Sequence, residues 1–329
     1  MTRRSLPTFS STGGTVAIAF VGVAYAFGTF FARRLTDAGL SPTTVAFARF
    51  ALVAVVLAPC LRRAARHRRA LVWGLTSGAV MALGWIAYVD GIGSGDVALV
   101  GVAYMTYPLF TLVMLAVVFG RRPTARQIGG GLLVLGAAFV ALSAESSGGG
   151  VPLITFAAPA TFGFSLAVLT ERLEVLAPSE RLASAAVGAA LTLLPFVGRL
   201  PADGVVPSSV SQWAWVVGLG VGAALVPMLI YAAAAPVLGA ARSAVAGATE
   251  LPMVFLIGGV VFGEVLTGRH LAAAGLVMVA IVVSSSGRTP HVLPDGDEPE
   301  DALESWPVDA GRFVEEIPVQ GLRKRTYVR

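Results

Sequence analysis

The sequence contains few charged residues, one cysteine and one lysine. Charged residues make up only 13% of its 329 positions, whereas soluble domains carry about a quarter, so an ordinary soluble protein is excluded. The single cysteine, Cys60, excludes an intramolecular disulfide and a metal site built from several cysteines. Because Lys324 is the only lysine and Ala, Gly, Val and Arg dominate, the composition indicates a GC-rich bacterial genome.

Motifs of the common enzyme classes are also missing. His67, His270 and His291 fall in predicted loops or in the C-terminal tail, without a His/Cys cluster or a glycine-rich phosphate loop. We therefore expect no enzyme, no metal and no other cofactor. The net charge of +5 would suit a nucleic-acid partner. However, the arginines stand in short segments between apolar stretches, which is typical of cytoplasmic loops, and we expect no nucleic-acid binding.

Long hydrophobic stretches dominate the chain, in which 56% of the residues are hydrophobic. A membrane-spanning helix needs about 20 mostly apolar residues. The sequence therefore predicts an all-α polytopic membrane protein with ten transmembrane helices. The predicted spans run over residues 14–32, 43–61, 70–89, 97–119, 127–144, 151–170, 183–198, 213–235, 243–263 and 270–286.

The loop arginines predict how the chain lies in the membrane. When the N-terminus is placed inside, most of these arginines fall in inside segments, which puts both termini in the cytoplasm. We expect a multi-pass protein of the bacterial plasma membrane with a short cytoplasmic tail at 1–12. Residues 287–329 are rich in acidic residues and proline and lack apolar periodicity, so they predict a disordered cytoplasmic tail.

The two halves of the chain match each other at an offset of 144 positions. They predict one repeat of five helices over 13–144 and a second over 145–286. An odd number of spans per repeat forces the second copy to insert upside down, an arrangement typical of secondary transporters with a site near the midplane. The glycine pairs also form GxxxG patterns, which let helices approach closely. The matches are Gly74 with Gly218, Gly78 with Gly222, and Pro108 with Pro252.

Three stretches carry a resemblance to a known family: the second span TVAFARFALVAVVLA with Arg49, the proline-bearing fourth and ninth spans, and VFGEVLTGRHLAAAGLVMVAIVVS (261–284). Over about residues 13–286 the chain resembles the EamA-type transporters of the drug/metabolite transporter superfamily. The resemblance implies ten helices in a five-plus-five inverted arrangement and export of amino acids or other small metabolites, often by proton exchange. The Gly-Glu turn at Glu264 is present in one half only, because Arg121 matches it, so we expect Glu264 to be structural.

Glu250 is the strongest candidate for a functional residue, because charges inside spans are rare and are usually functional. It lies in GATELPMVF (247–255), two residues before Pro252. We expect Pro252 to leave the carbonyl of Ala248 without its usual partner, so that this carbonyl could face a cavity. We expect both Pro108 and Pro252 to mark helix breaks that act as hinges. The Glu250 carboxyl could carry a proton or meet the amino group of a substrate. The alternative is a hydrogen-bonded structural acid between helices.

The position that matches Glu250 in the first half is Thr106. We expect this threonine and nearby aromatic residues to line a hydroxyl-rich cavity for a small amphipathic solute, with ordinary packing as the alternative. Arg49 either counters a substrate carboxylate or, in the interpretation we favour, snorkels or satisfies carbonyls at a helix end. The aromatic candidates are Trp85, Tyr88, Tyr104, Tyr107 and Tyr231.

These patterns together predict a secondary transporter. We expect an exporter of small metabolites, such as amino acids or related amphipathic compounds, that works by alternating access with proton antiport. A uniporter or importer of a small metabolite and a non-transporting membrane sensor or scaffold stay open as alternatives. The expected partners are a small-molecule substrate, membrane lipid and protons, and no pattern indicates an oligomeric state.

Overall fold

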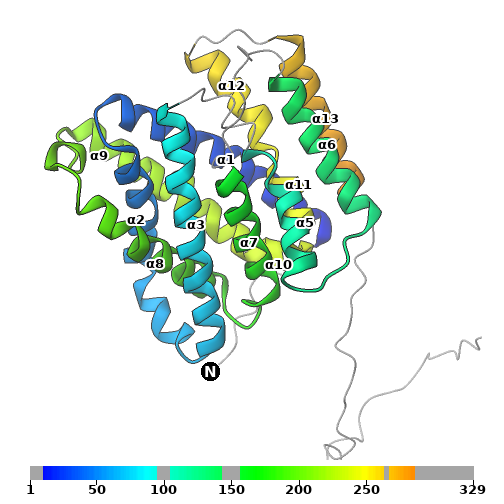
Figure 1. Cartoon of the computed structure of the whole chain (residues 1–329), viewed down its shortest axis with the longest axis horizontal. Coiled ribbons are helices and arrows are strands. Elements are labelled where there is room, and N and C mark those ends of the chain that lie inside the picture. The colour runs from blue at the N-terminus through cyan, green and yellow to red at the C-terminus, as the bar shows by residue number, and fades with distance from the viewer. Residues whose placement is uncertain (1–9, 95–103, 143–155, 263–266, 286–329) are drawn as a thin grey trace, which may run out of the picture. The chain divides into compact units, whose positions relative to one another are not determined.

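A computed structural model describes residues 10–94, 104–142, 156–262 and 267–285, and the regular elements in these ranges are all helices (Figure 1). Because the helices follow the apolar stretches, the prediction of an all-α protein is confirmed for this part of the chain. The first half contains α1 (Ser11–Asp37), α2 (Pro42–Ala64), α3 (Arg68–Ser94), α5 (Tyr107–Val117) and α6 (Ala125–Leu142). The second half contains α7 (Ala157–Glu171), α8 (Pro178–Val197), η2 (Ala202–Gly204), α9 (Val210–Val217), the π-helix η3 (Gly218–Leu225), α10 (Val226–Leu238), α11 (Ala240–Gly247), α12 (Glu250–Phe262) and α13 (Gly268–Ser285).

Six helical stretches in the described residues are long and apolar enough to cross a membrane. They are Thr12–Asp37, Pro42–Ala64, Arg68–Tyr88, Pro178–Val197, Val210–Leu238 and Ala240–Val261. Shorter apolar helices occupy Tyr107–Val117, Ala125–Val140 and Gly268–Ser284. The structure therefore indicates a multi-pass membrane protein, while ten spans in two repeats stay a prediction.

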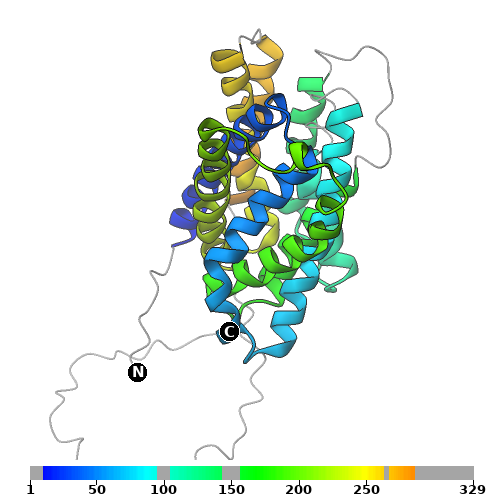
Figure 2. The same ribbon diagram turned by 90° about the vertical axis from the view of Figure 1, so that its left-hand side faces the viewer.

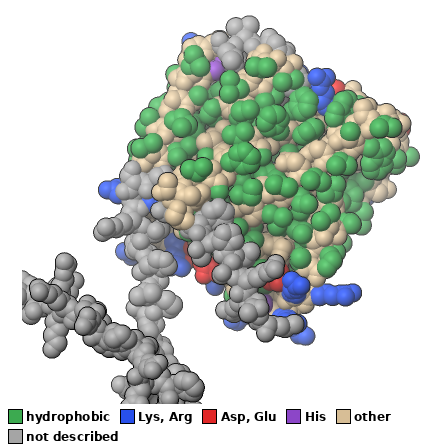
Figure 3. All heavy atoms as spheres, turned by 180° about the vertical axis from the view of Figure 1, so that it is seen from behind, with side chains coloured by type: hydrophobic (Ala, Val, Ile, Leu, Met, Phe, Trp, Pro, Cys, Tyr) green, Lys and Arg blue, Asp and Glu red, His purple; other side chains and the backbone are tan. Residues whose placement is uncertain are grey.

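The outer surface carries many large hydrophobic side chains (Figure 3). Val55, Phe139 and Val260 are 75%, 62% and 81% exposed. Soluble monomers rarely expose contiguous apolar patches larger than a few hundred Å², so a face of this kind requires lipid around it. In Figure 3 most of the arginine side chains lie near the ends of this apolar surface.

Contacts between helices follow the order of the two halves. α2 packs against α8, and α6 packs against α13. In each of these pairs, the two helices hold the same position in their respective halves. α7 packs against α3 and α5, and α1 packs against η3, α10, α11 and α12, which occupy the matching places in the second half (Figure 2). The main contacts between helices therefore persist when the two halves are exchanged.

Glycine allows the closest of these contacts, between α3 and α8. A Cβ on Gly78 would collide with the carbonyl of Ala185, and a Cβ on Gly188 would collide with the carbonyl of Leu75. Backbones this close replace the hydrophobic driving force that is missing in lipid. The GxxxG prediction holds for Gly74 and Gly78, which both face α8.

The matching glycine pair in the second half behaves differently. A Cβ on Gly218 would meet the ring of Phe31, but nothing lies within 4 Å of a Cβ on Gly222. The interpretation of these two as a packing pair is therefore wrong. Both lie in the π-helix η3, whose wider turns move residues four apart off a common face.

Arg181, at the start of α8, is a buried structural cation. Its guanidinium donates hydrogen bonds to four carbonyls, those of Leu173, Leu176, Glu174 and Ala232, at 2.8 to 2.9 Å. In α10, Pro236 has no N–H to bond the carbonyl four residues earlier, which is that of Ala232. Arg181 supplies the missing donor, so one side chain holds the α7–α8 turn and satisfies the free carbonyl in α10.

Candidate functional site

The fourth and ninth predicted spans are both interrupted just before their prolines. α5 begins at Tyr107 after Thr106 as its N-cap, and α12 begins at Glu250 after a break at residues 248–249. Pro108 and Pro252 thus lie in the first turns of new helices. Backbone N–H groups there have no intrahelical acceptor, so a proline costs little.

Pro252 removes the usual donor to the carbonyl of Ala248, as expected, but the carbonyl is not left free. It accepts a hydrogen bond from the N–H of Leu251 at 3.0 Å. The chain turns tightly between α11 and α12, and a donor three residues later replaces the one that Pro252 lacks. The break therefore exposes a helix N-terminus rather than a bare carbonyl.

Glu250 occupies the first turn of α12, where the helix dipole favours a negative charge. Its side chain is partly buried. Its neighbour Thr249 donates a hydrogen bond from Oγ1 to the carbonyl of Ala19 at 2.7 Å, and Gly22 allows α1 to lie against this turn. The break that carries the carboxylate is therefore fixed to the first helix.

Aromatic rings from α3, α5 and α7 meet beside this break. The ring of Tyr104 lies 5.3 Å from that of Tyr88, 5.6 Å from that of Tyr107 and 5.9 Å from that of Phe162. Trp85 contacts Tyr88 at 5.1 Å. The rings pack edge to face or tilted, the arrangements that aromatic pairs prefer. The candidates from the first half are thus brought together, and the cavity expected among them stays a prediction.

Two tyrosines converge on the end of α11. The hydroxyl of Tyr107 donates to the carbonyl of Ala244 at 2.8 Å, and a Cβ on Gly247 would lie 2.8 Å from that hydroxyl and 3.9 Å from the ring of Tyr231. The Tyr231 hydroxyl is buried without a hydrogen-bond partner among the described residues. Buried hydroxyls usually have a partner, so this one departs from the usual pattern.

Arg49 lies between two aromatic rings rather than at a helix end. The central carbon of its guanidinium is 5.1 Å from the ring centroid of Trp85 and 5.4 Å from that of Tyr25. Its Nε is buried and has no hydrogen-bond partner in the described part of the chain. The favoured interpretation, that Arg49 satisfies helix-end carbonyls, does not match this geometry.

Arg49 and Glu250 face the same group of rings. Their charges act on one another and on the hydroxyls of Tyr25, Tyr88 and Tyr104. Within the described residues, no salt bridge joins the two.

The sequence pointed to most of this cluster but missed two members, Tyr25 and Phe162. Tyr25 stacks near Tyr231 with ring centroids 6.5 Å apart. The chain has only six tyrosines, so its place inside the first span was a usable signal. Phe162 is one of 17 phenylalanines, and nothing in the sequence marks it. Glu264 lies outside the described residues.

Interrupted helices with charged residues beside the breaks are found in many membrane transporters. Residues 12–143 match the model of the EamA-like transporter family. Residues 12–143 are therefore similar to EamA-like transporters, and the resemblance to the drug/metabolite transporter superfamily is confirmed for this part of the chain. The family indicates a membrane transporter.

The fold also matches a solved structure entitled "Crystal structure of protein". That chain has 18% identity, a TM-score of 0.64, and coverage of 84% of this chain and 98% of its own. At this identity the likeness shows the fold alone. No curated protein matches this sequence.

Proposed function

We propose that this protein is a secondary transporter that exports small amphipathic metabolites, amino acids among them, by alternating access coupled to proton antiport. The observation that carries the proposal is the meeting of Arg49, Glu250 and the tyrosine cluster at the breaks in the fourth and ninth spans. Half-helices with a terminus near the midplane are how many transporters bind polar substrate groups.

The contacts between helices support two inverted repeats as the moving parts. When the two halves are exchanged, the contacts of α1 correspond to those of α7. The contacts α2–α8 and α6–α13 are unchanged by the exchange. Two copies of one unit that can exchange conformations give an inward-open and an outward-open state. In this proposal Pro108 and Pro252 mark the hinges, because the helix is already interrupted before each.

The roles of the two charges follow from their positions. Glu250, in the first turn of α12, would hold either a proton or the amino group of the substrate. Arg49, stacked on Trp85 and Tyr25, would meet the substrate carboxylate with the N–H donors at its edge. Tyr107, Tyr104, Tyr88 and Tyr231 would surround the apolar part of the substrate, and Thr106 would line the opposite break.

The test is flux through the full-length protein in proteoliposomes, with a panel of amino acids and a pH gradient. We expect Glu250→Gln to abolish the part of the flux that depends on the pH gradient, because glutamine cannot release a proton. Glu174→Gln is the matched control, since Glu174 is an exposed acid between α7 and α8, and it should leave flux unchanged.

The outcomes separate the parts of the proposal. Unchanged flux and unchanged gradient dependence in Glu250→Gln would show that the coupling role is wrong. If the parent protein moves none of the panel, amino acids are not the substrate class. Flux that moves substrate from the cytoplasmic face of the protein to its outer face would favour export, and flux in the opposite direction would favour the importer.

A further inference from the structure

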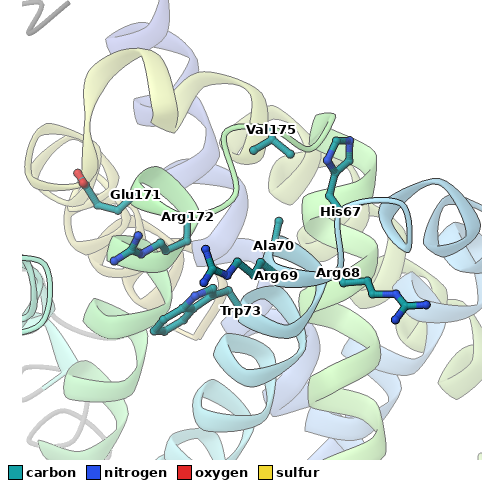
Figure 4. A pocket seen from close by; sticks show the side chains of 8 residues that line it. All are labelled: His67, Arg68, Arg69, Ala70, Trp73, Glu171, Arg172 and Val175. Carbon is teal, nitrogen blue, oxygen red and sulfur yellow. The ribbon is translucent and has the colours of Figure 1, made fainter. Parts of the chain in front are cut away.

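A groove of about 770 Å³ opens at the ends of α3 and α7, away from the aromatic cluster (Figure 4). By the arginine distribution it lies on the predicted cytoplasmic side. Its wall comes from the α2–α3 turn, the first turns of α3 and the end of α7. The lining residues are His67, Arg68, Arg69, Ala70, Trp73, Glu171, Arg172 and Val175.

The charges of this groove are not balanced inside it. Arg68, Arg69 and Arg172 bring three guanidinium groups, and Glu171 is the only lining acid. The carboxylate of Glu171 is already paired with Arg121, whose Nε lies 2.8 Å from Oε2. Figure 4 shows Glu171 at the far end from His67. The positive charge on the open side is therefore available to an anion.

One of the arginines is held in place before any ligand arrives. The guanidinium carbon of Arg172 lies 5.7 Å from the ring centroid of Trp73 and 5.5 Å from that of Phe119. Stacking on rings uses the faces of the guanidinium and leaves the N–H donors at its edge, which suit phosphate oxygens. An ordered donor loses less entropy on binding than a free surface arginine.

Arg69 and Trp73 complete the wall. In Figure 4 the Arg69 side chain rises beside Trp73 on the same side as Arg172, while the Arg68 guanidinium points away. The first turn of α3 faces the groove with Ala70, and its dipole adds to the field of the arginines. The apolar surface of Trp73 and Val175 lies next to these donors.

We propose that this groove binds a phosphate group, with Arg69 and Arg172 as the donors and Trp73 beside the organic part of the ligand. The phosphate can belong to the headgroup of an acidic phospholipid or to a soluble phosphate ester. A ligand bound here would tie the first turn of α3 to the end of α7 and so link the two halves at this end.

The experiment uses the full-length protein in phosphatidylcholine nanodiscs. One arm adds phosphatidylglycerol and counts the lipids retained on the protein by native mass spectrometry. The other arm titrates glycerol phosphate by calorimetry. The variant is Arg69→Gln with Arg172→Gln, and the control is Arg199→Gln, an exposed arginine outside the groove.

We expect the double variant to bind at least about tenfold more weakly, as loss of charge-assisted hydrogen bonds implies, and the control to bind like the parent. Loss in the lipid arm identifies a headgroup, and loss in the titration identifies a soluble ester. Equal binding by parent and double variant in both arms would overturn the proposal. Arg172 also stacks on rings, so its loss could prevent the double variant from folding. In that case the single variant Arg69→Gln is tested in its place.

Discussion

Two arginines in this protein share one local arrangement and differ in their surroundings. Arg49, inside α2, contacts the rings of Trp85 and Tyr25, and Arg172, at the end of α7, contacts the rings of Trp73 and Phe119. The Nε of Arg49 is buried without a partner among the described residues, whereas Arg172 is exposed at the groove. Stacking distances alone would not tell them apart.

The difference teaches that depth decides what a stacked arginine is for. A cation over rings gains about 0.5–1 kcal/mol at an exposed site and about 2 kcal/mol when desolvated. Burying an ion costs several kcal/mol, and Arg49 is half-buried with its Nε fully buried, so this cost works against the stacking. In the proposed function, Arg49 is kept for transport rather than for stability. At Arg172 the burial cost is small and the same stacking is net stabilising.

The largest expected effect comes from Arg49→Met. We expect flux in proteoliposomes to fall at least about tenfold, as loss of a charge-assisted contact to the substrate implies. We also expect the melting temperature in detergent to stay level or rise, because a buried cation replaced by an apolar side chain of similar length is often neutral or stabilising. A lower melting temperature with normal flux would assign Arg49 to structure instead.

A second prediction concerns the coupling of Arg49 to Glu250. In a double-mutant cycle of Arg49→Met with Glu250→Gln, we expect the effects on the free energy of unfolding to be non-additive by about 0.5–3 kcal/mol, the range for interacting groups. The control cycle pairs Glu250→Gln with Arg172→Met. Non-additivity of equal size in both cycles would mean that the two arginines do not differ in their relation to the acid.

Arg172→Met should have a smaller effect. We expect it to lower the free energy of unfolding by about 0.5–1 kcal/mol, the value of exposed cation–π contacts, and to leave flux unchanged. Chemical unfolding in detergent measures the first quantity and proteoliposomes the second. A loss of flux comparable to that of Arg49→Met would show that the groove belongs to the transport path.

The smallest effect concerns salt. The Debye length is about 8 Å at physiological ionic strength and about 3 Å at 1 M, so salt screens exposed charges far more than buried ones. We expect the contribution of Arg172 to unfolding, measured as parent minus variant, to shrink at high salt. The corresponding difference for Arg49 should not change. Equal salt dependence for both would mean that water reaches Arg49 freely.

The helices were predictable because their signal is local. Long apolar stretches predict helix type, and prolines such as Pro252 predict interruptions, since each depends on neighbouring residues only. The π-helix η3 was not predictable, because its hydrogen-bond pattern depends on how α1 and α2 pack against it. The same reason explains the mistaken interpretation of Gly222.

The candidate site was predictable in part. Glu250 and Arg49 stand out as rare charges in apolar spans, and the tyrosines stand out by their small number. That Arg49 stacks on Trp85 and Tyr25 depends on tertiary packing of three helices, which the sequence does not encode in its spacing. The groove joins residues about a hundred positions apart, from His67 to Arg172, and no sequence pattern marked it.

The bond from Arg181 to the carbonyl of Ala232 has a genetic consequence. Because Pro236 leaves that carbonyl without its normal donor, the arginine and the proline depend on each other although 55 positions separate them. A change of Pro236 to alanine restores an N–H four residues after Ala232 and removes one of the four tasks of Arg181. Such a change should act as a partial suppressor of the loss of Arg181, so the two positions are a natural place to look for compensating substitutions.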